Sequence, residues 1–228
     1  METELGQRKH LFTNKQLWAL LVPVVVEQIL NSLMGTADTM MVSNVGSAAI
    51  SAVSLVDSIN VLVIQVFAAL AAGGTIICSQ YMGQKNVKNA TDAAKQLIFI
   101  ITAIAVVLTA VCVVFQIPLL HLIFGKVEAE VMTNSEVYFL YTALSFPFIA
   151  VFNAGSSVFR AQENTSLPMT ISVISNIMNI VGNAILIFGF HMGVAGAALS
   201  TLISRIFCAI VVMYFLRNPK EEICVRDY

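Results

Sequence analysis

The chain has 228 residues, of which 58% are hydrophobic and only 11% are charged, and its formal net charge is −1. Soluble domains carry about 25% charged residues, so this composition excludes an ordinary soluble domain and indicates an integral membrane protein. The four cysteines are scattered without CxxC or Cys/His spacing, which gives no metal or redox motif.

Six apolar stretches are long enough to cross a bilayer, which takes about 20 helical residues. They are residues 17–41, 48–81, 97–118, 137–159, 169–190 and 194–216. Their length favours helices over barrel strands, and the second is long enough to require tilt, a kink or an extension beyond the bilayer. We therefore expect an all-α membrane protein with six transmembrane helices, flanked by polar segments at 1–16 and 217–228.

Lysine and arginine are distributed unevenly between the two sides of these spans. If the amino terminus is inside, ten of them fall on the cytoplasmic side, whereas Lys126 alone falls outside. Because basic residues favour cytoplasmic loops, this pattern predicts that both termini are cytoplasmic.

The first span carries three polar residues on one helical face, since Glu27, Asn31 and Asp38 are four and seven residues apart. Pro23 lies one turn before Glu27 and frees a backbone carbonyl. Acids inside a span mark a functional site by default, so this face is a candidate site for a proton or another cation. The alternative is that Asp38 only solvates the outer end of the helix.

Two further spans carry polar groups. Asp57 and Asn60 lie one turn apart in the second span, and Asn176, Asn179 and Asn183 share a face of the fifth. Amides are costly to leave unpaired in an apolar medium. These residues therefore either build a site or serve as hydrogen-bonding glue between helices.

Arg205 lies inside the sixth span, where it either snorkels toward the interface or pairs with an acid. Aromatic residues such as Tyr138 are spread along the spans and suit cation–π contact with a cationic ligand, although ordinary packing explains each of them too. No Walker A, GxSxG or HExxH motif and no basic aromatic patch is present. The sequence thus predicts neither an enzyme, an ATP-driven pump nor a nucleic-acid-binding protein.

Three segments together resemble one transporter family: "PVVVEQILNSLMGTADTMMVSNVGSAAISAVSL", "GGTIICSQYMGQKN" and "FRAQENTSLPM" with the asparagine-rich span after it. In order and spacing they are similar to the multidrug and toxic compound extrusion (MATE) family over nearly all of residues 15–216. The resemblance implies twelve helices in two six-helix lobes around a central cavity. It also implies export of cationic, amphipathic compounds in exchange for protons or sodium ions.

The resemblance also implies roles for particular residues. Asp38 matches the family's helix-one aspartate, Asn179 and Asn183 match two polar positions of helix five, and Pro23 matches a proline linked to bending. One branch of the family has aspartate where this chain has Asn183, and an amide cannot carry a proton. Asp38 or Glu27 would then carry the proton, or Asp38 would bind Na⁺, and no other cofactor is expected. The asparagine face of the fifth span is then interpreted as a polar wall that faces the whole polar side of the first span.

The resemblance covers one lobe only, so we expect the amino-terminal half of a plasma-membrane exporter. The chain would be a fragment, a truncated product, or a half that pairs with a second lobe within the lipid bilayer. One alternative is a flippase for lipid-linked saccharides, which would need a basic cavity, whereas Glu27, Asp38 and Asp57 outnumber Arg205. The other alternative is a non-transporting membrane remnant or scaffold.

Overall fold

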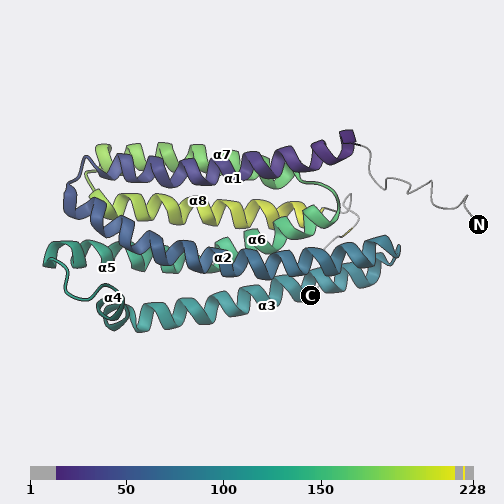
Figure 1. Cartoon of the computed structure of the whole chain (residues 1–228), viewed down its shortest axis with the longest axis horizontal. Coiled ribbons are helices and arrows are strands. Elements are labelled where there is room, and N and C mark those ends of the chain that lie inside the picture. The colour runs from purple at the N-terminus through teal and green to yellow at the C-terminus, as the bar shows by residue number, and fades with distance from the viewer. Residues whose placement is uncertain (1–13, 219–222, 224–228) are drawn as a thin grey trace, which may run out of the picture.

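The computed structural model describes residues 14–218 and residue 223, so most of the predicted segments 1–16 and 217–228 lies outside the described residues. The described chain is helical throughout (Figure 1). In chain order the elements are α1 (Asn14–Val42), α2 (Ser47–Gly83), α3 (Val87–Val114), α4 (Gln116–Phe124), α5 (Ala129–Leu144), α6 (Phe146–Ala161), α7 (Ser166–Asn183), the π-helix η1 (Ala184–Gly189) and α8 (Gly193–Leu216).

Six membrane spans are present when one broken span is included. Five spans are long and apolar enough by themselves, and α5 and α6 form the sixth with a bend of 42° between them. The predicted number of transmembrane helices and the all-α class are therefore confirmed, and the protein is a multi-pass membrane protein.

The break between α5 and α6 divides the single span that was predicted over 137–159 into two helices. Pro147 lies in the first turn of α6 and has no N–H to donate to the carbonyl of Ala143, one turn back. That carbonyl accepts a hydrogen bond of 3.1 Å from the Thr109 hydroxyl of α3 instead. The Ser145 hydroxyl at the break donates to the carbonyl of Thr142 at 2.6 Å, so the polar groups at the bend are satisfied inside the bundle.

Two other predicted boundaries were wrong. The stretch 97–118 is divided between α3, which begins earlier at Val87, and the short helix α4, which starts at Gln116. The Asn86 side chain caps the start of α3 by accepting from the Asn89 N–H at 3.1 Å, a polar signal that a hydropathy window passes over. The fourth span was expected to begin at residue 137, but α5 begins at Ala129.

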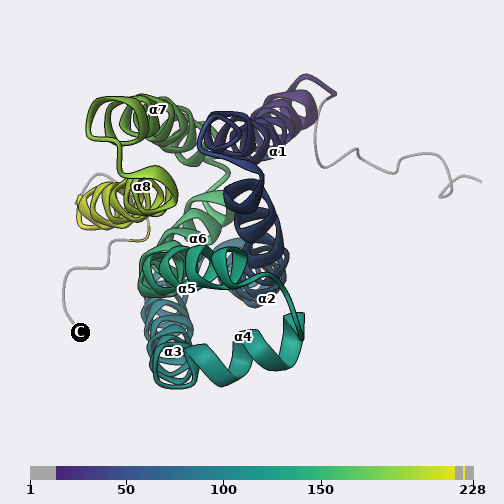
Figure 2. The same cartoon turned by 90° about the vertical axis from the view of Figure 1, so that its left-hand side faces the viewer.

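The broken span α5–α6 lies at the centre of the bundle, where it packs against α2, α3 and α8. Figure 2 shows α7 and α1 side by side at one edge, with α3 and α4 at the opposite edge. α1 packs mainly against α7 and only slightly against α2 and α8. The first helix is therefore a peripheral one.

The bundle exposes large apolar side chains to its outside and buries small polar side chains within an apolar core. Large apolar side chains are exposed on the outer faces of several helices, among them Trp18, Leu62, Val107 and Ile210. Asparagine, serine and threonine side chains are buried instead, mostly in α5 to α8. This is the distribution expected of a helix bundle that faces lipid, because interhelical contacts there rely on small and hydrogen-bonding residues.

Small residues bring α6 and α8 into close contact. A Cβ atom added at Gly155 would lie 2.7 Å from a methyl group of Val212 and 3.2 Å from Leu216. Val212 is β-branched and buried, so it has few ways to move aside.

We expect Gly155→Ala to destabilise the protein by about 1–3 kcal/mol, because the added methyl group forces α6 and α8 apart. The measurement is thermal unfolding of the purified chain in detergent. Gly73→Ala is the matched control, since nothing lies within 4 Å of a Cβ at Gly73 and alanine favours helix over glycine by about 1 kcal/mol. Equal unfolding temperatures for the two variants would show that the α6–α8 contact is not tight.

Candidate functional site

Asp38 and Asn183 join α1 to α7 through a buried hydrogen bond. Asp38 lies one turn before the end of α1, and Asn183 is the last residue of α7. The Asn183 side-chain amide donates to the carboxyl Oδ1 of Asp38, and the two residues are only 5% and 0% exposed. The predicted meeting of the asparagine face with the aspartate of the first span is therefore present in the fold.

The hydrogen bonds continue from α7 into α8. The Asn183 amide also donates to Oδ1 of Asn179 at 3.3 Å, and the Asn179 amide donates to the Thr201 hydroxyl at 3.2 Å. The Ser200 hydroxyl donates to the backbone carbonyl of Asn179 at 2.8 Å. One buried network thus links three helices, and we call Asp38, Asn179, Asn183 and Thr201 the Asp38 network.

Sequence reasoning missed Thr201. Its hydroxyl also donates to the Ala197 carbonyl of its own helix at 3.0 Å, which is common for threonine in apolar helices. The sequence signal was a pair of adjacent small polar residues, Ser200 and Thr201, in a mostly apolar span.

One buried oxygen of the Asp38 network has no partner among the described residues. It is Oδ1 of Asn183, whose amide nitrogen serves both Asp38 and Asn179. A carboxylate and an unused amide oxygen on adjacent side chains are the ligand types that hard cations prefer. The arrangement can therefore hold a proton on the carboxyl group or a small cation between the oxygens.

The remaining asparagine of the predicted face lies apart from this network. Asn176 is buried, but its amide nitrogen has no partner within the described part of the chain. The side chain of Asn31 lies outside the described residues.

Asp57 is the centre of a second polar cluster, between α2 and α5. Its Oδ1 accepts from the Asn60 amide at 3.2 Å and from the Tyr138 hydroxyl at 3.1 Å. Arg205 of α8 donates from Nη1 to the Ser145 hydroxyl at 2.7 Å. In this cluster, Tyr138 is thus a hydrogen-bond donor to the Asp57 carboxyl group.

Glu27 forms an ion pair with Arg160 of α6, with 2.7 Å between Oε2 and Nη2. Glu27 and Asp38 share a face of α1 by spacing, but they are eleven residues apart, about 16 Å along a helix. The prediction that the asparagines face the whole polar side of the first span was therefore wrong, because Glu27 contacts α6 rather than α7. Pro23 is buried one turn before Glu27, and α1 continues through it as one helix.

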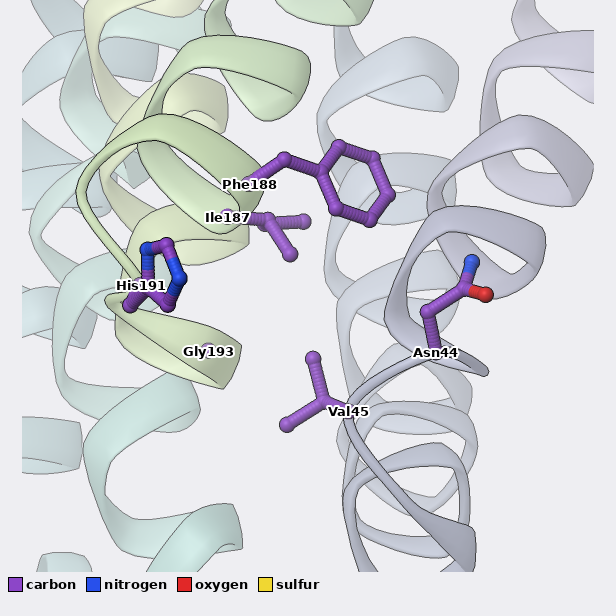
Figure 3. A pocket seen from close by; sticks show the side chains of 6 residues that line it. All are labelled: Asn44, Val45, Ile187, Phe188, His191 and Gly193. Atoms are coloured by element: carbon purple, nitrogen blue, oxygen red, sulfur yellow. The ribbon is translucent and has the colours of Figure 1, made fainter.

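A pocket of about 310 Å³ lies where α1 ends and the chain turns from η1 into α8. Figure 3 shows Asn44 and Val45 on one side and Phe188 and His191 on the other. None of the predicted site residues lines it. The candidate site is therefore the buried Asp38 network, and this pocket is separate from it.

The sequence of this chain matches the family model MatE over residues 23–185. The chain belongs to the MatE family. The matched range begins at Pro23 and contains Asp38, Asn179 and Asn183. The resemblance to MATE transporters that the sequence predicted is thus confirmed.

Of two curated relatives of this MatE chain, one is named a transporter and the other a multidrug resistance protein. It is 32% identical over 212 residues to the uncharacterized transporter YisQ of Bacillus subtilis, covering 91% of this chain and 46% of YisQ. It is 29% identical over 214 residues to the probable multidrug resistance protein NorM of Thermotoga maritima, covering 91% of this chain and 45% of NorM. The MatE chain spans about half the length of these relatives.

Solved MATE structures share the fold. A MATE structure in the bent conformation superposes with a TM-score of 0.86 at 23% identity, covering 94% of this chain and 48% of that one. An outward-facing multidrug resistance MATE transporter gives the same TM-score, identity and coverage. The six-helix bundle is therefore half of a MATE-type fold.

We expect Glu27→Gln to destabilise this MatE bundle by about 1–3 kcal/mol, because it leaves the Arg160 guanidinium without its charged partner. Breaking a fully buried pair costs about 3–5 kcal/mol, and the Arg160 side chain is 30% exposed, which lowers the cost. Thermal unfolding measures the loss. Glu130→Gln at an exposed site should change stability by less than about 0.5 kcal/mol, and a Glu27→Gln loss no larger than this would contradict the expectation.

Proposed function

We propose that this chain is the amino-terminal lobe of a cation-coupled exporter of cationic, amphipathic compounds. The observation that carries the proposal is the Asp38 carboxyl group, buried within a span and bonded to an amide whose own oxygen has no partner among the described residues. Ionisable residues inside a membrane are costly and mark ion pathways.

The coupling ion is a proton or Na⁺, and it binds at Asp38. A proton goes onto the carboxyl group, since the amides of Asn179 and Asn183 cannot titrate near neutral pH. Na⁺ would take the Asp38 carboxylate together with the unpartnered oxygen of Asn183. Either ion changes how well the Asp38 carboxyl group accepts the hydrogen bond from Asn183. Because this bond joins α1 to α7, the ion alters the position of α1 relative to α7. The ion can shift the lobe between conformations only if it binds one of them more tightly.

The charge of the spans favours cationic cargo. The first two spans, residues 17–42 and 47–83, hold the acids Glu27, Asp38 and Asp57 and no lysine or arginine. A flippase for lipid-linked saccharides needs a basic cavity for a pyrophosphate group, which this balance does not favour. Among the relatives, the Staphylococcus saprophyticus protein MepA is named a multidrug export protein, which supports a role in drug efflux.

Transport by this chain requires a second six-helix lobe. Alternating access in such transporters is the movement of one repeat against another around a site near the midplane, and the relatives are about twice as long as this chain. The second lobe would join it in the plasma membrane, with the ends of the described bundle near residues 14 and 218 facing the cytoplasm. Neither a cofactor nor catalysis is needed beyond the coupling ion.

Replacing Asp38 with Asn should abolish ion-coupled efflux, because the amide keeps the size of the side chain but binds neither a proton nor Na⁺ well. The assay is efflux of a cationic dye from proteoliposomes that contain this chain together with the carboxy-terminal half of YisQ, driven by a proton or Na⁺ gradient. We expect gradient-driven efflux in the wild type and none above background with Asp38→Asn.

Glu27→Gln is the matched control, since it removes a second carboxyl group of α1 that lies outside the Asp38 network. It should retain gradient-driven efflux per folded molecule. Undiminished efflux with Asp38→Asn would refute the proposed site. No efflux with the wild-type pair would favour a non-transporting scaffold.

A further inference from the structure

Two aspartates of the bundle are held by the same arrangement of side chains. Oδ1 of Asp38 accepts from the side-chain amide of Asn183, and Oδ1 of Asp57 accepts from the side-chain amide of Asn60 at 3.2 Å. In both pairs the asparagine Oδ1 is buried and has no partner among the described residues. The proposed function uses the first pair only, so the second pair is without a role.

The unpartnered oxygen of Asn60 lies beside the Asp57 carboxylate. Asn60 is only 3% exposed, and its amide nitrogen donates to Asp57. Because the oxygen belongs to the same small planar group as that nitrogen, it lies close to the carboxylate too. A buried amide oxygen without a donor is costly in apolar surroundings. A cation at this position would satisfy the Asn60 oxygen and neutralise the carboxylate together.

The Asp57 carboxylate has hydrogen bonds but no ionic partner. Besides the bond from Asn60, it accepts one from the Tyr138 hydroxyl of α5 at 3.1 Å. No lysine or arginine forms an ion pair with it within the described part of the chain. Arg205 of α8 donates to the Ser145 hydroxyl instead. The carboxylate charge is therefore not compensated by any direct contact with a described basic residue.

The depth of Asp57 in its span suits a coupling ion. Asp57 is ten residues from the start of α2 at Ser47, about 15 Å along a helix, and the hydrocarbon core is about 30 Å thick. Ion sites of transporters built from two repeats lie near the bilayer midplane. Asp57 is half-buried, whereas Asn60 and Tyr138 are buried, so an ion can approach the carboxylate from its exposed side.

We propose that Asp57, Asn60 and Tyr138 form a second cation site, separate from Asp38, which binds Na⁺. The carboxylate supplies the charge, and the Asn60 Oδ1 and the Tyr138 hydroxyl oxygen supply neutral oxygen ligands, which hard cations prefer. A proton would need the carboxylate alone, whereas three oxygens from two helices suit a metal ion. One carboxylate balances one positive charge, which favours Na⁺ over a divalent ion. This inference goes beyond the proposed function, because it concerns a different carboxylate and stands or fails without Asp38.

The test is Na⁺-dependent thermal stabilisation of the 228-residue chain in detergent, with Na⁺ exchanged for choline at fixed pH and ionic strength. A ligand that binds only the folded state raises the unfolding temperature. The wild type is compared with Asp38→Asn, which removes the site of the proposed function. Asp57→Asn and Asn60→Leu are then each added to Asp38→Asn. Both added substitutions approximately keep the size of the side chain, and an amide at position 57 can still accept the bond from Tyr138.

We expect Asp38→Asn to keep a saturable stabilisation by Na⁺. Adding Asp57→Asn should abolish it, because the site then has no charge. Adding Asn60→Leu should weaken Na⁺ affinity about tenfold, the effect of losing one polar contact to a charged group. A merely structural role of Asp57 or Asn60 would lower the unfolding temperature equally with and without Na⁺. It would therefore leave the Na⁺-dependent increment unchanged.

Glu128→Gln in the Asp38→Asn chain is the matched control, because it removes a carboxylate at an exposed position where salt screens the charge. It should change Na⁺ affinity by less than about twofold. If the chain with Asp57→Asn does not fold, the affinity of the chain with Asn60→Leu decides the question.

Three results would overturn the second site. In the first, the wild type responds to Na⁺ and Asp38→Asn does not, which leaves the site at Asp38 standing. In the second, either added substitution leaves the Na⁺ response of Asp38→Asn unchanged. In the third, neither the wild type nor Asp38→Asn responds to Na⁺, and the efflux assay with a proton gradient still tests Asp38 by itself.

Discussion

The bond between Asp38 and Asn183 is the interaction on which the account of this lobe depends. A buried carboxyl group is costly unless another group satisfies it, and the α7 amide satisfies the buried Asp38. α1 is otherwise a peripheral helix with much of its apolar surface exposed. A second polar contact holds α1 in the bundle, namely the ion pair of Glu27 with Arg160. Glu27 lies about three helical turns from Asp38. Any group that competes for Asp38 therefore acts on the position of α1.

The rest of the bundle supports this arrangement by placing polar groups inside and apolar groups outside. Thr201 and Ser200 extend the bonding of α7 into α8, and Arg205 fastens α8 to the bend between α5 and α6. The bend itself is satisfied by Thr109, so the break in the span exposes no backbone acceptor at Ala143 to lipid. The apolar core thus contains a local polar network held by hydrogen bonds, in which a charge can be accommodated.

Hydropathy and helical spacing predicted the spans and the site in outline. Apolar runs of about 20 residues gave the six spans, and spacing of three and four residues placed Asn176, Asn179 and Asn183 on one face. Spacing could not choose between partners, because Glu27 and Asp38 share a face yet contact different helices. Pro147 signalled the break at Ser145 in the sequence. The hydrogen-bond donor to the freed Ala143 carbonyl is Thr109 of another helix, however, and the sequence did not indicate it. Thr201 and the pairing of Arg160 likewise depend on tertiary packing, which a local pattern does not encode.

A cation bound at Asp38 is expected to change the position of α1 relative to α7. The most direct measurement is the distance between spin labels at Met40 on α1 and Phe190 just beyond η1, which are 67% and 69% exposed. It is taken by double electron–electron resonance on the chain in lipid nanodiscs, with and without saturating Na⁺ and at neutral and acidic pH. The account predicts that one of these cations shifts the distance distribution in the wild type and not in Asp38→Asn. An unchanged distribution in the wild type, or the same shift in Asp38→Asn, would contradict it.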